Sequence, residues 1–255
     1  MSTEPQSLVS LIAGGFSRRS VGMLILIFST YASVGIGFPF LIDPTLKADW
    51  LLFGIWTVMT LAMTWDVAPS RDVKLILTGL VGGLVIEWWG TNTELWRYYT
   101  DERPPLWILP AWPIAALTID RLGTLLDAAV PILRTWGKAY WVIMPLFVVA
   151  MTRFLWPSIH EPASWVVIGI MLAVMLWRPR TGKDLTLFVA GASLGIFLEY
   201  WGTSRQCWIY YSGQVPPPEA VFAHGFASVA FARGVQFLEL PFTVGAPGAS
   251  PAGES

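Results

Sequence analysis

The sequence predicts an all-α fold, a polytopic transmembrane bundle of about eight helices arranged as two tandem parallel four-helix repeats. Composition is the first observation that predicts it. The chain has 255 residues, of which 55% are hydrophobic and 13% charged, and its mean hydropathy is +0.57. A soluble globular chain carries about 25% charged residues. Apolar stretches recur along the whole length, which is typical of a helical membrane protein.

The second observation is an internal repeat with an offset of 112 residues. The stretch "IEWWGTNTELWRYY" begins at Ile86, and "LEYWGTSRQCWIYY" begins at Leu198. Between Glu87 and Tyr99, seven of thirteen positions are identical to those of the second stretch. An aromatic-rich composition alone would not keep this register, so we interpret it as a duplication.

Each repeat contains four apolar segments, and each segment is predicted to form a helix. They are 21–42, 50–66, 73–91 and 106–130, then 139–156, 163–178, 184–203 and 219–240. Because four spans per repeat is an even number, both repeats enter the membrane from the same side. This predicts a pseudo-twofold axis along the membrane normal. The stretch 106–138 also leaves room for a surface helix.

The domain organisation follows from these segments and from the positive charges. We expect an N-terminal segment 1–20, the repeats 21–132 and 133–243, and a disordered Gly/Pro/Ser-rich tail 244–255. With the N-terminus inside, eleven of the sixteen Lys and Arg residues lie on or near the inner side. Positive residues favour the cytoplasmic side. The sequence therefore predicts a multi-pass protein of a bacterial inner membrane with both termini cytoplasmic.

A stripe of small and polar residues follows the third and seventh predicted helices. Its members are four residues apart and share one helix face. They are Gly79, Gly83, Glu87 and Thr91, with Gly191, Gly195, Glu199 and Thr203 in the second repeat. Glycines at this spacing let membrane helices approach closely. We expect 73–91 and 184–203 to cross near the pseudo-twofold axis and to point both glutamates into the bundle.

Glu87 and Glu199 are the candidate catalytic residues. Each lies fifteen residues after an aspartate at the start of its helix, about 22 Å into a hydrocarbon core of about 30 Å. A charge at the centre of the core costs about 2.5–3.5 kcal/mol or more. Since no Lys or Arg lies within a helical turn, we predict that at least one of the two is neutral at pH 7 and can donate a proton. The alternative is a polar lock between helices.

Residues around the glutamates are the candidate substrate-binding set, because aromatic faces stabilise positive charge. The set is Trp88, Trp89, Thr91, Tyr200, Trp201, Thr203 and His224. Core packing or an aromatic belt at the membrane interface is the alternative for its aromatic members. Trp96, Tyr98 and Tyr99 follow the predicted helix end, and we interpret them as interface anchors.

Several classes of function are excluded. A net charge of −1 argues against a nucleic-acid partner. The single cysteine, Cys207, excludes an intrachain disulfide framework and a cysteine-cluster metal site. Two histidines without Glu-x-x-His pairs predict no di-iron site, and no nucleotide-binding glycine motif occurs, so we expect neither metal nor cofactor. The expected partners are membrane lipid and an apolar isoprenoid-type ligand.

The two repeated stretches also resemble a known group of proteins. Glu-x-x-Gly followed by Trp-x-Tyr-Tyr and prolines is similar to membrane-embedded carotenoid-pathway proteins, the carotenoid hydratases and small lycopene cyclases, and to related uncharacterised bacterial membrane families. The paired acidic residues that the lycopene cyclases favour are absent here. The resemblance implies hydration or cyclisation of a polyene, with Glu87 or Glu199 protonating a double bond as general acid.

Two other functions remain open from the residues alone. One is a small-solute or proton-coupled transporter, in which polar groups lie at the interface of internal repeats. The other is a non-catalytic scaffold or assembly factor, in which the stripe only holds two helices together.

Overall fold

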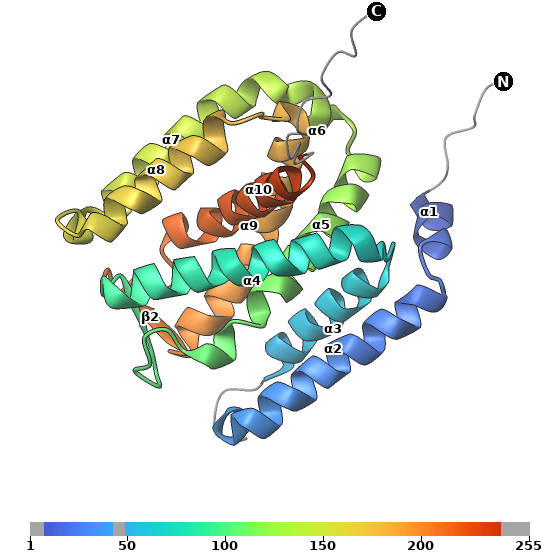
Figure 1. Cartoon of the computed structure of the whole chain (residues 1–255), viewed down its shortest axis with the longest axis horizontal. Helices are drawn as coiled ribbons and strands as arrows, with labels where there is room; N and C mark the ends of the chain where they lie inside the picture. The colour runs from blue at the N-terminus through green and yellow to red at the C-terminus, as the bar shows by residue number, and fades with distance from the viewer. Residues whose placement is uncertain (1–7, 43–48, 241–255) are drawn as a thin grey trace, which may run out of the picture.

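The computed structural model describes residues 8–42 and 49–240 (Figure 1). Its long helices are α2 (Arg18–Gly37), α3 (Trp50–Thr64), α4 (Pro69–Asn92), α5 (Ala111–Ala129), α7 (Tyr140–Phe154), α8 (Pro162–Leu176), α9 (Thr181–Ser204) and α10 (Pro218–Leu238). Its short elements are α1 (Leu8–Gly14), α6 (Ile132–Thr135), single 3-10 turns at Pro39–Ile42, Leu106–Ile108, Trp136–Ala139 and Trp156–Ser158, and the strands β1 (Trp96–Tyr98) and β2 (Trp208–Tyr210).

The all-α prediction is confirmed, and each of the eight predicted apolar segments overlaps one long helix of the described residues, although α4 and α9 extend beyond both ends of theirs. The helix α6 lies within the stretch that left room for a surface helix. Within the predicted N-terminal segment 1–20, the described residues form α1 and the start of α2. The predicted tail 244–255 lies outside the described residues.

Local sequence explains where several helices begin. Ser17 caps α2, and its side chain and that of Ser20 form a capping box. Asp49 caps α3 by accepting hydrogen bonds from the backbone N–H groups of Leu51 and Leu52. Pro69 opens α4 at a position where a missing N–H costs nothing.

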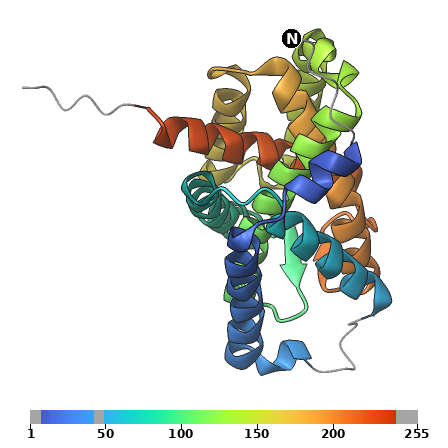
Figure 2. The ribbon, with the colours of Figure 1, turned by 90° about the vertical axis from the view of Figure 1, so that its right-hand side faces the viewer.

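The long helices form three groups (Figure 1). The pair α2–α3 lies on one side, the pair α7–α8 lies on the other, and α4, α5, α9 and α10 lie between them. The turned view in Figure 2 shows α2 along one edge of the molecule, where only Ser20, Met23 and Ile27 of its side chains are buried. The central four helices therefore hold the two pairs together.

Within the described residues, four helices are long and apolar enough to cross a membrane: α2, α4, α9 and α10. The 24 residues of α4 and of α9 correspond to about 36 Å, which exceeds a hydrocarbon core of about 30 Å. The helices α3 and α8 are apolar but have only 15 residues each. Several apolar helices of this kind are compatible with an integral membrane protein.

Elements of the two halves recur at the offset of 112 residues, and we call two residues separated by this offset equivalent. The bounds of α3 and α8, of α4 and α9, and of β1 and β2 are equivalent. Residues with positive φ also occur in equivalent pairs, among them Glu94 with Gln206 and Asp66 with Arg178. The two strands pair antiparallel with Arg97 opposite its own equivalent, Ile209. A two-fold axis through the centre of this ladder produces such a register.

The glycine stripe packs differently from the prediction. A Cβ added at Gly79 would lie 3.0 Å from the Cα of Pro113 in α5, and one at Gly191 would lie 2.3 Å from Ser228 Oγ in α10. The expectation that α4 and α9 meet through their glycines was therefore wrong. Each stripe instead faces the antiparallel helix that follows in its own half, the partner that the short connecting segment brings nearest.

Two buried ion pairs fasten the other ends of these helices. Arg121 Nη2 lies 2.6 Å from Asp72 Oδ1, with both side chains at most 2% exposed. Arg233 pairs with Asp184 in the same way. The two aspartates also accept backbone N–H groups at the starts of α4 and α9. Each half therefore joins the start of its glutamate-bearing helix to its fourth long helix.

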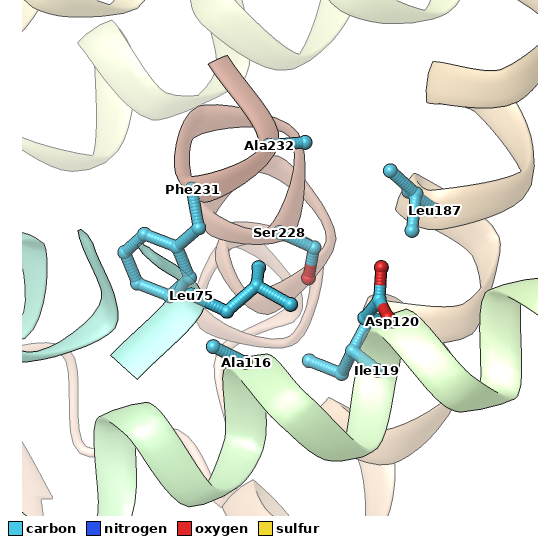
Figure 3. A pocket seen from close by; sticks show the side chains of 8 residues that line it. All are labelled: Leu75, Ala116, Ile119, Asp120, Leu187, Ser228, Phe231 and Ala232. Carbon is cyan, nitrogen blue, oxygen red and sulfur yellow. The ribbon is translucent and has the colours of Figure 1, made fainter. Parts of the chain in front are cut away.

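One small cavity of about 10 Å³, shown in Figure 3, lies among the central helices and has room for about one water molecule. Its lining residues come from both halves: Leu75, Ala116, Ile119, Asp120, Leu187, Ser228, Phe231 and Ala232.

Candidate functional site

A large cavity of about 550 Å³ lies between the two halves. Side chains from α2, α3, α4, α5, α7, α8, α9, α10 and both strands line it, and most of them are apolar or aromatic. Glu87, Glu199 and His224 are the only carboxylate or imidazole groups among the described lining residues, which include no Lys or Arg. Pockets of this character, apolar with a few convergent polar groups, are typical binding sites.

Glu87 is buried in α4 and accepts three hydrogen bonds. Tyr98 Oη donates to Oε1 at 2.9 Å, and Trp112 Nε1 donates to the same oxygen at 3.1 Å. Trp96 Nε1 donates to Oε2 at 3.2 Å. All three donors are neutral, so no cation balances a charge on this carboxyl.

Glu199 occupies the equivalent position in α9 with one changed partner. Trp208 Nε1 and Tyr210 Oη each donate to Oε2 at 3.0 Å. The third partner is His224, whose Nε2 lies 2.9 Å from Oε1. A histidine can exchange a proton with a carboxyl group, whereas an indole N–H can only donate a hydrogen bond. The two halves therefore hold the same carboxyl in chemically different surroundings.

The repeated motif explains how these donors reach the glutamates. After α4 ends, β1 brings Trp96 and Tyr98 back toward the helix, and alternate strand residues share one face. Gly90 lies beneath the Trp96 ring, where an added Cβ would come within 1.8 Å of it. Gly202 makes the same room for Trp208. In the repeated motif, the Glu thus supplies the carboxyl group, the Gly leaves space beside it, and the Trp and Tyr donate two of its hydrogen bonds.

The prediction that Trp96 and Tyr98 are interface anchors was therefore wrong. Trp96, Tyr98 and Tyr210 are buried, Trp208 is partly buried, and all four bond a glutamate. Hydropathy placed them beyond a helix end but carried no information on the direction of the chain after it.

Burial, reinforced by the adjacent glutamates, raises the pKa of Tyr98 and of Tyr210 well above the ordinary tyrosine value. Both strand residues consequently keep their hydroxyl protons through neutral and moderately alkaline pH. They remain hydrogen-bond donors to the glutamates throughout that range.

The structure divides the remaining members of the predicted set. Trp89, Trp201 and His224 line the cavity. Trp88 and Tyr200 do not: they point outward and are 51% and 52% exposed.

Thr91 and Thr203 are buried and donate to backbone carbonyls of their own helices, those of Glu87 and Glu199, at 2.6 Å. Spacing by four correctly placed both threonines on the glutamate face, but their hydroxyls serve the helix rather than the cavity.

Trp112 is a site residue that the sequence interpretation missed. The available signal was its position, since it is the equivalent of His224. Its ring and that of His224 lie in contact, with centroids 5.9 Å apart.

Within the described ranges, 8–42 and 49–240, no group of three or more His, Cys, Asp and Glu side chains is placed to hold a metal ion. Comparison of the chain with protein-family models, curated proteins and solved structures found no match in any of the three.

Proposed function

We propose that the chain is an integral membrane enzyme that takes an isoprenoid or carotenoid-like lipid into the large cavity and protonates one of its double bonds. The observation that carries this proposal is the cavity itself, an aromatic and apolar space faced by Glu87, Glu199 and His224. A carbon–carbon double bond needs a general acid, and the cation it forms needs electron-rich faces. The resemblance of the repeated motif to carotenoid hydratases and small lycopene cyclases supports the same chemistry.

In the proposed architecture, eight helices form two parallel four-helix repeats about a pseudo-twofold axis along the membrane normal. The equivalent helix bounds and the pairing of Arg97 with Ile209 support this axis. The distribution of Lys and Arg supports cytoplasmic termini and a bacterial inner membrane.

A lipid substrate would enter sideways from the bilayer. Several cavity-lining side chains also reach the outer surface of the bundle: Trp56 and Val85 are each 41% exposed, and Ile170 is 45% exposed. They come from three different helices, α3, α4 and α8. Apolar lining residues that also face outward suit a ligand dissolved in hydrocarbon.

The proton donor is the pair formed by Glu199 and His224. Nε2 of His224 lies 2.9 Å from Oε1 of Glu199, so the two groups share one hydrogen-bonded proton, which the pair gives to the substrate. The proton forms a new C–H bond with the electron pair of the double bond, which leaves a carbocation. Water or a second double bond then captures the cation, and the proton lost at the end of the reaction returns to the pair.

Glu87 has a supporting role. Its partners, Trp96, Tyr98 and Trp112, are donors without a proton to exchange at neutral pH. This carboxyl therefore holds the three aromatic side chains in place and stabilises the carbocation electrostatically. The same three bonds also fit a purely structural lock. A scaffold function therefore remains the second candidate, favoured by the Glu87 network.

Turnover of lycopene in liposomes that contain the full chain tests the proposal. Hydration adds the mass of one water, and cyclisation leaves the mass unchanged, so mass spectrometry separates the two. Glu199→Gln should lower turnover at least about 100-fold, the usual minimum for loss of a general acid. Glu94→Gln is the matched control, because Glu94 is exposed and pairs only with Arg103. Equal turnover in both variants would leave the scaffold function as the better account.

A further inference from the structure

We infer that the lipid that binds most tightly in the large cavity carries a neutral oxygen acceptor, a hydroxyl or carbonyl group, held by the indole N–H of Trp201. This inference rests on the proposed lipid-binding function and names the substrate class more closely. It starts from a donor that the fold leaves without a partner.

Trp201 lines the cavity from α9. Its Nε1 atom is shielded from solvent and has no hydrogen-bond partner among the residues that the structure describes. Buried donors in native proteins are almost always paired, and each exception calls for an explanation. A bound ligand with an acceptor atom supplies one.

In the first half, the tryptophan equivalent to Trp201 has a hydrogen-bond partner for its indole N–H. Trp89, the equivalent of Trp201, donates from Nε1 to Ser164 Oγ in α8 at 3.2 Å. The residue equivalent to Ser164 is Leu52 in α3, which has no acceptor and lines the cavity. At this equivalent position the first half therefore offers the indole of Trp201 no side-chain acceptor, and the cavity is lined by Leu52 instead.

A second donor lies in the same part of the site. The hydroxyl of Tyr31 is also shielded and makes no hydrogen bond of ordinary geometry, with only a weak side-chain contact to Thr60. Tyr31 and Trp201 line the same cavity and pack against the same apolar cluster, which includes Met59 and Leu194. One oxygen atom on a ligand can accept from both kinds of donor.

The lining decides which oxygen group fits. An indole N–H donates only, so the ligand atom must be an acceptor, which excludes an ammonium group and leaves a pure hydrocarbon without this contact. No Lys or Arg occurs among the described lining residues, so nothing balances a phosphate or diphosphate. An isoprenoid alcohol or carbonyl compound satisfies both conditions.

Two lipids of one chain length test the inference directly. The probes are tritiated geranylgeraniol and the hydrocarbon with the same skeleton but no hydroxyl group. Their equilibrium partition between empty nanodiscs and nanodiscs that hold the full chain gives two dissociation constants. We expect the alcohol to bind about 3–10-fold more tightly, the range of one net hydrogen bond.

Four substitutions assign that preference to the indole N–H. Trp201→Phe should reduce it to what the Tyr31 hydroxyl alone supports, and Trp89→Phe should retain it in full, because the Trp89 donor is already bonded to Ser164. Leu52→Ser should also weaken it by giving Trp201 an internal acceptor. Leu52→Ala removes the same volume without an acceptor and should retain it.

The outcomes separate this inference from the function on which it rests. Equal binding of the two lipids to the wild-type chain, or a preference that Trp201→Phe leaves unchanged, overturns the inference and leaves the lipid-binding function intact. Failure of both lipids to bind overturns the function and the inference together.

Discussion

Trp112 and His224 stack ring on ring at equivalent positions of the two halves, with centroids 5.9 Å apart and planes inclined by 13°. Each ring also bonds the glutamate of its own half, Glu87 or Glu199. The contact brings together the two residues by which the hydrogen-bond partners of Glu87 and Glu199 differ.

Replacing His224 should abolish turnover without unfolding the protein. His224→Phe keeps an aromatic ring against Trp112 and removes the nitrogen that lies 2.9 Å from Glu199. We expect lycopene turnover to fall at least about 100-fold.

Trp112→Phe is the matched control for that variant. It keeps the stacking ring and removes a neutral donor from Glu87, which retains Trp96 and Tyr98. Turnover within about tenfold of wild type is expected. A larger loss of turnover in Trp112→Phe than in His224→Phe would contradict the assignment of proton transfer to Glu199 and His224.

Adding a methyl group at Gly90 should displace Trp96 from Glu87. The new Cβ would lie 1.8 Å from the indole ring. Because alanine has no alternative rotamer, the overlap is relieved only if Trp96 or the backbone moves. Overpacking of this kind costs about 1–3 kcal/mol. Thermal unfolding of Gly90→Ala and Gly202→Ala in detergent should show this loss in both halves.

Gly169→Ala is the control for the glycine variants, because nothing lies within 4 Å of the Cβ it would add in α8. Its stability should be unchanged or slightly higher, since alanine favours a helix over glycine. Equal stability of all three variants would contradict the packing of Trp96 and Trp208 over the helix ends.

Breaking one buried ion pair should destabilise the fold strongly. Arg121→Met leaves Asp72 buried without its cation, which costs about 3–5 kcal/mol. Adding Asp72→Asn should recover most of the loss, because the remaining group is neutral. Lys74→Met, which breaks the more exposed pair with Glu239, should cost less than about 1 kcal/mol. A larger loss of stability in Lys74→Met than in Arg121→Met, measured by chemical denaturation in detergent, would contradict this prediction.

Tyr98 and Tyr210 predict a loss of stability at alkaline pH. Burial raises the pKa of both above about 10, the value in an unfolded chain. Above that pH the unfolded state binds fewer protons than the folded state. The free energy of unfolding therefore falls as pH rises from about 10 toward the folded pKa, by about 1.4 kcal/mol per pH unit for each tyrosine.

Thermal unfolding between about pH 8 and 12 measures that slope. The double variant Tyr98→Phe with Tyr210→Phe lacks both titrating groups, so its stability should depend less on pH than that of the wild type. Parallel curves for the two proteins would show that these hydroxyls are not held protonated by the fold.

Hydropathy and repeat spacing predicted much of this molecule. Apolar segment lengths located all eight long helices, because chain length in a helix follows directly from residue count. Spacing by four placed Glu87 and Glu199 on the inward face of their helices, and both are at most 5% exposed. His224 could be singled out because its equivalent is not a histidine.

The contacts made after a helix ends could not be predicted in the same way. The return of Trp96 and Tyr98 to Glu87 depends on the pairing of β1 with β2, a contact between residues far apart in the sequence. The partner of the glycine stripe depends on which helix lies nearest in space. Trp112 gave no chemical signal alone, because a tryptophan near a helix start is common in a membrane protein.

Identification of the lipid that co-purifies with the full chain tests the central claim most directly. The protein would be extracted in mild detergent from cells that make carotenoids, and its bound lipid identified by mass spectrometry and visible absorption. We predict about one isoprenoid or polyene molecule per chain, reduced in a variant whose cavity is filled by Ala223→Trp, a lining position. Bulk phospholipid alone, in equal amounts in both proteins, would contradict the assignment of the cavity to such a lipid.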